Sequence, residues 1–406
     1  MAEPSTPTTD TRLSAGDLKA KLDRGDSLVV FDVRPREMTK AWRVEGRDNL
    51  RFVNVPYREM VPQGAADDDP VGKIGRYVQD QLSDELPEGA EIVTVCAKGI
   101  SSIDVANALR QLDYDAWTLA GGMDAWSDFY DVKTVMETDR LGLYQITRPA
   151  RGCVSHVVIS EGEAAVIDPL RHIDPYRQLV RDHGVEIRYV LDTHAHADHI
   201  SGGPALAEDA GVDYWLHPYD AIHPIDVLPA RLDFAYLQDG QTFRVGDADI
   251  DVIHIPGHTL GNVAFRANGQ YLLTGDSVFI GSIARPDLGG QGETWAPLHY
   301  RSLRRLLELP DDTIVLPGHF NSPDEADENA IYQASLGDLK ATNEGLRMAQ
   351  ESERAFVDFI LGSLPTFPEQ YVDIKRVNAG LIAPEEDGAR ILETGRNVCA
   401  LASSAS

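Results

Sequence analysis

The sequence runs Thr193-His194-Ala195-His196-Ala197-Asp198-His199 directly after an apolar segment, Arg188 to Leu191, whose composition predicts a β-strand. Histidines two positions apart on extended backbone project to the same side, and a tight turn after them brings the aspartate and the last histidine within reach. Imidazole and carboxylate are common ligands of first-row transition metals. This stretch therefore predicts a metal site at the end of a strand.

Three further ligand candidates lie downstream, each directly after a glycine at the end of an expected strand. They are His258 in Pro256-Gly257-His258, Asp276 in Thr274-Gly275-Asp276, and His319 in Pro317-Gly318-His319. Five of the chain's 12 histidines thus belong to one set of motifs, which a scatter of solvent-exposed histidines would not produce. His254 lies four positions before His258, but on a strand that spacing is not a shared helical face, so we assign it a structural role.

Strand and helix patterns alternate around these motifs, and the pattern becomes helical beyond Asn321. Expected strands span 154–160, 164–168, 188–191, 250–255, 271–274 and 313–316, with a helix over 174–183. Expected helices of the C-terminal part span 328–349, 351–363 and 367–379. From Ala400 the residues are small and polar, so this end is expected to fray.

An N-terminal segment has an α/β pattern of its own. Leu28 to Val33 and Glu91 to Val95 are expected strands, and the second continues into Cys96-Ala97-Lys98-Gly99-Ile100-Ser101-Ser102. A helix follows, which Ser101 or Ser102 can cap. Alternating strands and helices predict a parallel sheet over residues 13–131 after a flexible tail, 1–12. The polar stretch Ser127 to Asp139 is the expected linker.

Cys96 occupies a position that favours a reactive thiolate. At the junction of a strand and a helix N-terminus, converging backbone N–H groups and the helix dipole both stabilise an anionic sulfur. Gly99 lets the loop curl, and Lys98 adds a cation. Cys153 and Cys399 have apolar neighbours and are expected to be packing residues.

The charge balance excludes several kinds of partner. Lys+Arg number 37 against 65 Asp+Glu, a formal net charge of −28, and the acids are spread through every segment. Such a surface repels phosphates and anionic lipid, which argues against nucleic-acid and membrane partners. We interpret the acidic surface as adaptation to high salt, where screening shortens the Debye length to about 3 Å at 1 M.

With no signal pattern and no Cys-x-x-Cys motif, a cytoplasmic location is expected.

The thiol loop resembles the active-site loop of rhodanese sulfurtransferases in its Cys-x-x-Gly-x-Ser pattern. Asp32-Val33-Arg34 and Leu119-Ala120-Gly121-Gly122-Met123-Asp124-Ala125-Trp126 also resemble signatures of that family. The resemblance implies a parallel-sheet domain that transfers sulfane sulfur through a Cys96 persulfide, with Lys98 near the anionic sulfur. Thiosulfate or sulfite would be its small-molecule partners.

The histidine and aspartate motifs resemble the metallo-β-lactamase fold over residues 136–321, which implies a four-layer αββα sandwich followed by a helical extension, 322–406. Two chemistries compete within that fold. In iron persulfide dioxygenases, His194, His258 and Asp276 would bind one Fe(II), and His196, Asp198, His199 and His319 would surround it. In glyoxalase II-like hydrolases, His194, His196 and His258 would bind one zinc, and Asp198, His199 and His319 a second, with Asp276 as the bridge.

Two features favour iron. The stretch Ile283-Ala284-Arg285-Pro286-Asp287 resembles the Arg-x-Asp segment of persulfide dioxygenases, where Arg285 could hold an anionic substrate group. A rhodanese-like partner domain also handles sulfane sulfur. The sequence thus predicts oxidation of a low-molecular-weight thiol persulfide by O₂ to sulfite at one Fe(II), coupled to sulfur transfer.

The alternatives are a two-zinc thioester hydrolase, a non-enzymatic sulfur carrier or sensor and, disfavoured by the net charge of −28, a nuclease of the same fold. The identity of the thiol carrier and the formation of homo-oligomers stay open.

Overall fold

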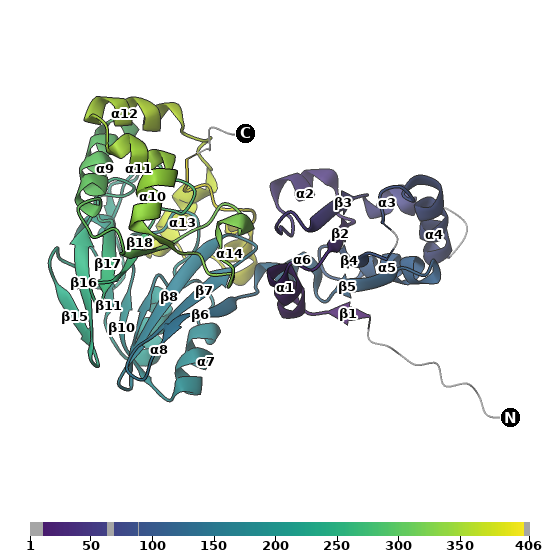
Figure 1. The fold of residues 1–406 in the computed structure, drawn as a ribbon, viewed down its shortest axis with the longest axis horizontal. Coiled ribbons are helices and arrows are strands. Elements are labelled where there is room, and N and C mark those ends of the chain that lie inside the picture. Colours follow the sequence, from purple (N-terminus) through teal and green to yellow (C-terminus); the bar gives the residue numbers. More distant parts are fainter. Residues whose placement is uncertain (1–10, 63–68, 88, 402–406) are drawn as a thin grey trace. The chain divides into compact units, whose positions relative to one another are not determined.

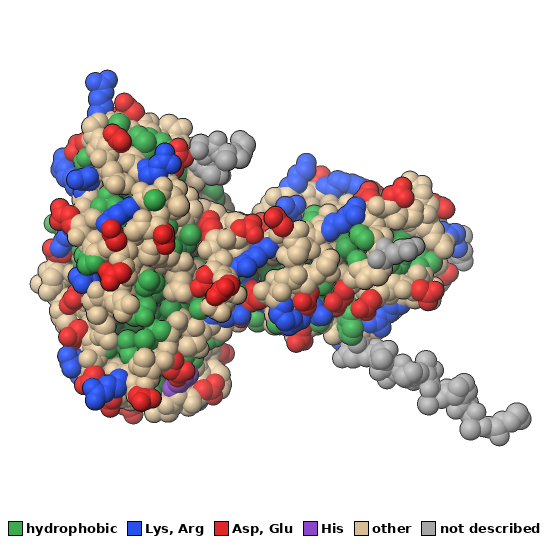
Figure 2. All heavy atoms as spheres, viewed as in Figure 1, with side chains coloured by type: hydrophobic (Ala, Val, Ile, Leu, Met, Phe, Trp, Pro, Cys, Tyr) green, Lys and Arg blue, Asp and Glu red, His purple; other side chains and the backbone are tan. Residues whose placement is uncertain are grey.

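The computed structural model describes residues 11–62, 69–87 and 89–401, which form two compact units that divide between Asp131 and Val132 (Figure 1). Most of the expected tail, up to Asp10, lies outside the described residues, and the first strand already begins at Arg12. Acidic and basic side chains are interspersed over the visible face of each unit (Figure 2). Among the described residues, no helix combines the length and apolar character that crossing a membrane requires.

The first unit is built on one parallel sheet, as the alternation of strands and helices predicts. Its strand order is β1-β5-β4-β2-β3, and every pairing is parallel. The strands are β1 (Arg12–Leu13), β2 (Leu28–Asp32), β3 (Leu50–Asn54), β4 (Glu91–Val95) and β5 (Asp115–Leu119). The helices are α1 (Ala15–Arg24), α2 (Arg36–Ala41), α3 (Tyr57–Met60), α4 (Pro70–Gln81), α5 (Ser101–Gln111) and α6 (Gly122–Ser127). The interior strand β2 is buried along its whole length, as expected for a sheet covered on both faces.

The second unit contains two sheets packed face to face, which confirms the expected sandwich (Figure 1). The seven-stranded sheet consists of β6 (Asp131–Glu137), β7 (Gly142–Arg148), β8 (Cys153–Ser160), β9 (Glu163–Ile167), β10 (Glu186–Leu191), β11 (Tyr214–Leu216) and β14 (Ala235–Tyr236). The six-stranded sheet consists of β15 (Thr242–Val245), β16 (Ala248–His254), β17 (Val263–Ala267), β18 (Tyr271–Gly275), β19 (Ile314–Pro317) and β20 (Ala334–Ser335). A short ribbon pairs β12 (Ile222–His223) with β13 (Leu228–Pro229).

Side chains alternate across the six-stranded sheet, and this alternation produces the layers. Phe265 and Leu273 face the core between the sheets, whereas Ala264 and Leu272 face the covering helices. Helix α8 (Gly203–Ala210) packs on β10 and β11 of the other sheet. The remaining helices are α7 (Asp174–His183), α9 (Gly292–Leu306), α10 (Leu336–Thr342), α11 (Glu344–Ala349), α12 (Glu353–Gly362), α13 (Gln370–Asn378) and α14 (Glu386–Leu392), with short 3₁₀ turns at Pro218–Ala221 and Pro323–Glu325.

Three local expectations are wrong. The stretch expected as a linker does contain the division between the two units, but its residues Asp131–Glu137 form β6, whose alternating exposure suits an edge strand. The helix expected over 328–349 is interrupted, because the Ser335 and Asn343 side chains accept N–H groups and start separate helices, α10 and α11. Of the end expected to fray, Ala400 and Leu401 are instead buried, and Ala284 and Ala400 form a β-bridge, whereas residues 402–406 lie outside the described residues.

The C-terminal helices are part of the second unit. Leu336, Leu346 and Phe356, from α10, α11 and α12, share one hydrophobic cluster with β17, β18 and β19. A second cluster joins Tyr371 and Ile374 of α13 to Ala197 in the histidine-rich loop. Residues beyond 321 therefore complete the sandwich and reach the ends of the strands that carry the ligand motifs.

Candidate metal centre and thiol site

The candidate ligands lie on loops that follow strands of both sheets. Loop 192–201 follows β10, and Asp276 and His319 come after the parallel strands β18 and β19. Gly275, before Asp276, has a φ of +48°, and a Cβ there would lie 2.3 Å from Thr193 Oγ1, so only glycine fits.

His194, His258 and Asp276 converge on one point. Their candidate ligand atoms all lie within 4.8 Å of one another, and the three side chains are fully buried. Asp276 Oδ2 is 3.4 Å from His258 Nε2 and 3.9 Å from His194 Nε2. None of these three atoms has a hydrogen-bond partner within the described part of the chain. Because buried polar atoms are normally satisfied, three convergent orphan atoms fit a bound cation.

The other ring nitrogens show how the two histidines are oriented. The Thr193 hydroxyl donates to Asp168, so at 2.9 Å from His194 Nδ1 it accepts the ring proton. His258 Nδ1 is 2.8 Å from the Arg285 carbonyl, which can only accept. In both rings the proton therefore resides on Nδ1, and Nε2 presents its lone pair to a metal.

His196 lies with a different group. Its Nε2 is 3.3 Å from Asp168 Oδ1 and 3.9 Å from Asp192 Oδ1, and these three side chains form a separate buried cluster. Asp192 is itself fixed by hydroxyl donors, Ser201 at 2.6 Å and Tyr214 at 2.7 Å. The His196 ring thus lies nearest to the Asp168–Asp192 pair and outside the His194–His258–Asp276 group, and among the described residues neither of its nitrogens has a hydrogen-bond partner.

The other three expected ligands form a second group together with a cysteine. Ligand atoms of Asp198, His199, His319 and Cys153 lie within 4.8 Å of one another. His319 connects the two groups, because its Nδ1 contacts Asp276 Oδ1 in a short hydrogen bond and its Nε2 is 2.7 Å from Asp198 Oδ2. The structure therefore brings all seven candidate ligands into one buried region.

The two groups differ electrostatically. Burial lowers the pKa of His194 well below its usual value, and it also lowers the pKa of His258, so both rings are neutral. For His199, burial is outweighed by Asp198, which raises the pKa to about 10. For His319, Asp198 and Asp276 outweigh burial and raise the pKa well above its usual value. Without metal, the second group is an ion-paired cluster, whereas the first group offers lone pairs.

Both cysteines expected to serve only as packing residues lie in this region. Cys153 Sγ is 3.4 Å from Asp198 Oδ2, and Cys399 Sγ lies within 4.8 Å of ligand atoms of Asp198 and Asp276. Burial raises the pKa of Cys399 well above its usual value, and Asp198 and Asp276 raise it further. The apolar sequence neighbours of the two cysteines gave no indication of these contacts. Cys153 reaches the region because it is the first residue of β8 and forms a β-bridge with His319, which is distant in the sequence.

Arg285 takes a different place from the one expected. It is fully buried, and its guanidinium binds Asp287 and the carbonyls of Pro365, Thr366 and Val398. With these partners, the planar guanidinium holds the C-terminal segment in place. Arg285 therefore has a structural role in this unit, and not the expected role of binding a substrate anion. Its connection to the metal centre is the backbone carbonyl that orients His258.

Residues far along the chain fix the histidine-rich loop. Asn378, at the end of α13, donates to the carbonyls of His196 and His199 at 2.8 Å, and its Oδ1 accepts the N–H of Ser201 at 2.9 Å. Arg151 donates to the Asp198 carbonyl, and Glu393 Oε1 accepts the N–H of Ile200 at 2.9 Å. The loop therefore depends on the C-terminal segment for its shape.

The expected nucleophile of the first unit sits on a tightly packed loop. Cys96 is 5% exposed, and its Sγ accepts the Ile100 N–H at 3.2 Å and the Ser102 hydroxyl at 3.3 Å. Burial raises the thiol pKa, but these donors and the Ser101 hydroxyl outweigh it, so the net shift is downward. Ile100, and not a serine, occupies the N-cap of α5, which frees the Ser102 hydroxyl for the sulfur. Lys98 is exposed.

Comparison with known proteins identifies both units. Residues 148–319 match the metallo-β-lactamase superfamily, and residues 14–129 match the rhodanese-like domain. An uncharacterized protein of Mycobacterium leprae is 33% identical over 186 residues, which cover 39% of this chain and 82% of that protein. A hydroxyacylglutathione hydrolase of Xanthomonas euvesicatoria pv. vesicatoria is 33% identical over 211 residues, which cover 52% of this chain and 74% of the hydrolase.

A solved metallo-β-lactamase from Staphylococcus aureus subsp. aureus COL aligns with a TM-score of 0.52 at 25% identity and covers 59% of this chain and 73% of its own. The chain belongs to the metallo-β-lactamase superfamily. Within the superfamily it has a particular architecture, in which a rhodanese-like domain precedes the sandwich and helices follow it.

We predict that Asn378→Ala lowers the metal affinity of the second unit. The variant removes three hydrogen bonds to the loop that carries His194 to His199, and loss of such outer contacts typically costs about 10- to 100-fold. Competition with a chelator measures the affinity, and the exposed Asn329→Ala serves as the matched control. Equal affinities for the two variants would contradict a role of Asn378 in shaping the loop.

We further predict that Ser102→Ala raises the pKa of Cys96. Removing a hydroxyl donor destabilises the thiolate relative to the thiol, so the sulfur should ionise at higher pH. The rate of alkylation by iodoacetamide against pH reports this ionisation, with Cys96→Ser as the background. Replacing the exposed Ser83 by alanine should leave the pH midpoint of alkylation unchanged. If the midpoint is also unchanged in Ser102→Ala, Ser102 does not stabilise the thiolate.

Proposed function

We propose that the second unit oxidises a low-molecular-weight thiol persulfide with O₂, and that the rhodanese-like unit transfers sulfane sulfur through Cys96. The proposal rests on one observation above all: the orphan Nε2 atoms of His194 and His258 converge with Oδ2 of Asp276. Two imidazoles and one carboxylate are the donor set of non-haem iron(II) oxygenases. One Fe(II) per chain is the cofactor that we assign to them.

The reaction balances with water as the only additional reactant. A persulfide RSSH reacts with O₂ and H₂O to give a thiol RSH and sulfite, and the persulfide loses four electrons, which O₂ accepts. When bound, iron(II) would supply the redox chemistry needed to use O₂, and His194, His258 and Asp276 would hold it. Thr193 and the Arg285 carbonyl keep the ring protons on Nδ1, and His319 fixes Asp276, so the three donors are oriented in advance.

The position of His196 supports one metal over two. A dinuclear site would use His196 together with His194 and His258, whereas Nε2 of His196 lies beside Asp168. The rhodanese-like domain adds a second reason, because a cysteine persulfide is a product of the chemistry that such a domain performs on thiosulfate. We assign sulfur transfer to residues 13–131 and oxidation to the unit beyond them.

A zinc-dependent thioester hydrolase is the second candidate function. Relatives at about one-third identity are named hydroxyacylglutathione hydrolases, and Asp198, His199 and His319 also converge. Asp198, His199 and His319 would bind a second metal if the metal displaced the ion pairs between them. Metal analysis separates the candidates, because one iron per chain supports oxidation and two zincs support hydrolysis.

We predict that His258→Ala abolishes both iron content and oxygen uptake with a persulfide, while His196→Ala keeps substantial iron and loses about 10- to 100-fold in activity. The first variant removes one of three protein donors, and the second removes a neighbour of them. Iron per chain and oxygen consumption are measured on the same preparations. Complete metal loss in His196→Ala would favour the dinuclear hydrolase, and full activity of His258→Ala would reject the assigned ligands.

We also predict that Cys96→Ser abolishes sulfur transfer from thiosulfate and leaves iron content and oxygen uptake with a supplied persulfide nearly intact. A serine hydroxyl neither ionises near neutral pH nor forms a persulfide. The two rates are compared on one preparation, with Ser83→Ala as the control. A sulfurtransferase rate that survives in Cys96→Ser would support the carrier or sensor reading for the first unit.

A further inference from the structure

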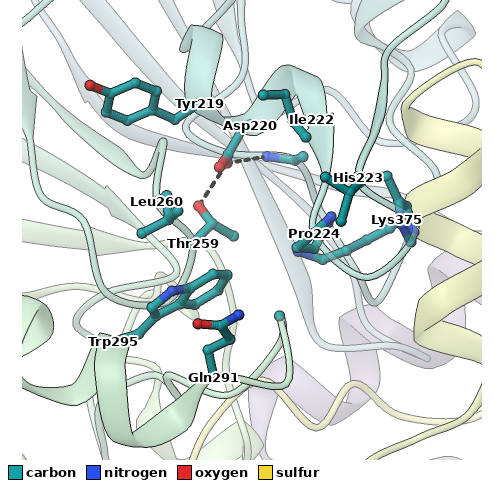
Figure 3. A pocket seen from close by; sticks show the side chains of 13 residues that line it. Tyr219, Asp220, Ile222, His223, Pro224, Thr259, Leu260, Gln291, Trp295 and Lys375 are labelled. Carbon is teal, nitrogen blue, oxygen red and sulfur yellow. Dashed lines mark hydrogen bonds between the residues drawn. The ribbon is translucent and has the colours of Figure 1, made fainter.

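The second unit contains a cavity of about 240 Å³ that is lined by sequence neighbours of two candidate ligands (Figure 3). Its lining includes Ala195, which separates His194 from His196, and Thr259, which follows His258. The side chains of Ile222, Leu260 and Trp295 give it apolar walls. A molecule in this cavity would therefore rest against both ligand loops.

The carboxylate that lines the cavity already has partners. Asp220 accepts the Ala195 N–H at 2.8 Å, the Thr259 hydroxyl at 2.6 Å and the Gly261 N–H at 2.7 Å. These bonds tie the two ligand loops together (Figure 3). Asp220 is thus a structural acceptor that positions the loops.

Lys375 is the cation that lines the cavity, and its charge has no local partner. It comes from α13, is 4% exposed, and faces the cavity opposite Leu260 and Trp295 (Figure 3). Within the described residues, its ammonium makes no hydrogen bond and no ion pair within 4.0 Å, and Asp220 attracts it only from a distance.

An ammonium buried in this way is costly for the fold. Burial disfavours the charged form and lowers the pKa of Lys375. Lys375 lines the same cavity as Ala195 and Thr259, which are the sequence neighbours of His194 and His258. An anion bound in the cavity would neutralise this charge close to the metal centre.

We propose that this cavity binds the carrier part of the persulfide, and that Lys375 pairs with an acidic group, a carboxylate or a phosphate, on that carrier. The inference rests on the proposed oxidation of a thiol persulfide and adds the chemical class of the thiol. The volume lies below the range of about 300–1,000 Å³ usual for drug-sized ligands, so the carrier portion inside is small. Its body is apolar where it meets Leu260 and Trp295, and its acidic end meets Lys375.

The test compares matched ligands that cannot react. The non-reacting thioether 3-(methylthio)propanoate carries the carboxylate, its primary amide is neutral and similar in shape, and 2-(methylthio)ethyl phosphate carries the alternative acid. Titration calorimetry on the full chain measures their binding, and a change in tryptophan fluorescence that is absent from Trp295→Phe gives a second signal. Wild-type protein should prefer at least one acid over the amide.

Lys375→Met keeps the length of the side chain and removes its charge. It should weaken binding of the preferred acid by about 10- to 100-fold, the usual effect of losing a buried charge-assisted hydrogen bond, and leave the amide within about twofold. Lys375→Arg should restore part of the preference, and Lys340→Met, which removes a lysine paired with Asp311 elsewhere in the unit, should change nothing. The thermal midpoint of Lys375→Met should not fall, because an unpaired buried charge is removed.

The outcomes separate this inference from the proposed function. Equal loss of acid and amide binding in Lys375→Met would show that the lysine only packs, and an unchanged preference for the acid would show that it is not the partner; either result overturns the inference. Oxygen uptake with the persulfides of 3-mercaptopropionate and of its amide then tests the reaction. If neither persulfide is oxidised but the binding preference depends on Lys375, the proposed oxidation is rejected, whereas the inference that the cavity binds an acid is supported.

Discussion

The structure of the metal centre depends on the carbonyls of the loop from His194 to Ser201. A loop that directs three histidines and an aspartate inward cannot satisfy its own backbone, so the carbonyls of His196, Asp198 and His199 need donors from elsewhere in the unit. Asn378 and Arg151 supply them. Because Arg151 precedes β8 and Asn378 ends α13, the arrangement of the loop depends on both the sandwich and its C-terminal helices.

The same principle accounts for the distribution of charge. Five buried aspartates surround the histidines: Asp168, Asp192, Asp198, Asp220 and Asp276. Asp168 and Asp220 accept hydrogen bonds from the ligand loops, and Asp192 accepts them from hydroxyl groups. Asp198 is paired with imidazolium rings, which holds its pKa well below the usual value despite its burial. Among the described residues, Asp276 Oδ2 and Asp192 Oδ1 have no hydrogen-bond partner, and of these two oxygens the one of Asp276 faces His194 and His258.

Sequence patterns predicted much of the fold, because strand ends and glycine turns are local features. The segments 174–183 and Glu91 to Val95 match α7 and β4 residue for residue, and the seven motif residues lie together in one buried region. Local sequence patterns could not predict side-chain contacts between segments that are distant in the sequence. Cys153 and Cys399 were predicted to pack in apolar surroundings, and the path of the chain places both beside Asp198. Lys375 gave no signal either, since a lysine on an amphipathic helix is usually exposed; Asp168 could have been found, as it ends a strand in the way Asp276 does.

The C-terminal contacts also set an order of events during biosynthesis. Asn378 and Glu393 are translated long after His199, at 5–20 residues per second roughly ten to forty seconds later. Until they emerge, the loop has its histidines and aspartate but lacks the donors and acceptors that shape it. A nascent chain that has reached only His199 would therefore carry these ligands on a loop whose shape is not yet fixed. The contacts that order the loop form only after Asn378 and Glu393 have been translated, so ordering of the ligands is a late step in the synthesis of the second unit.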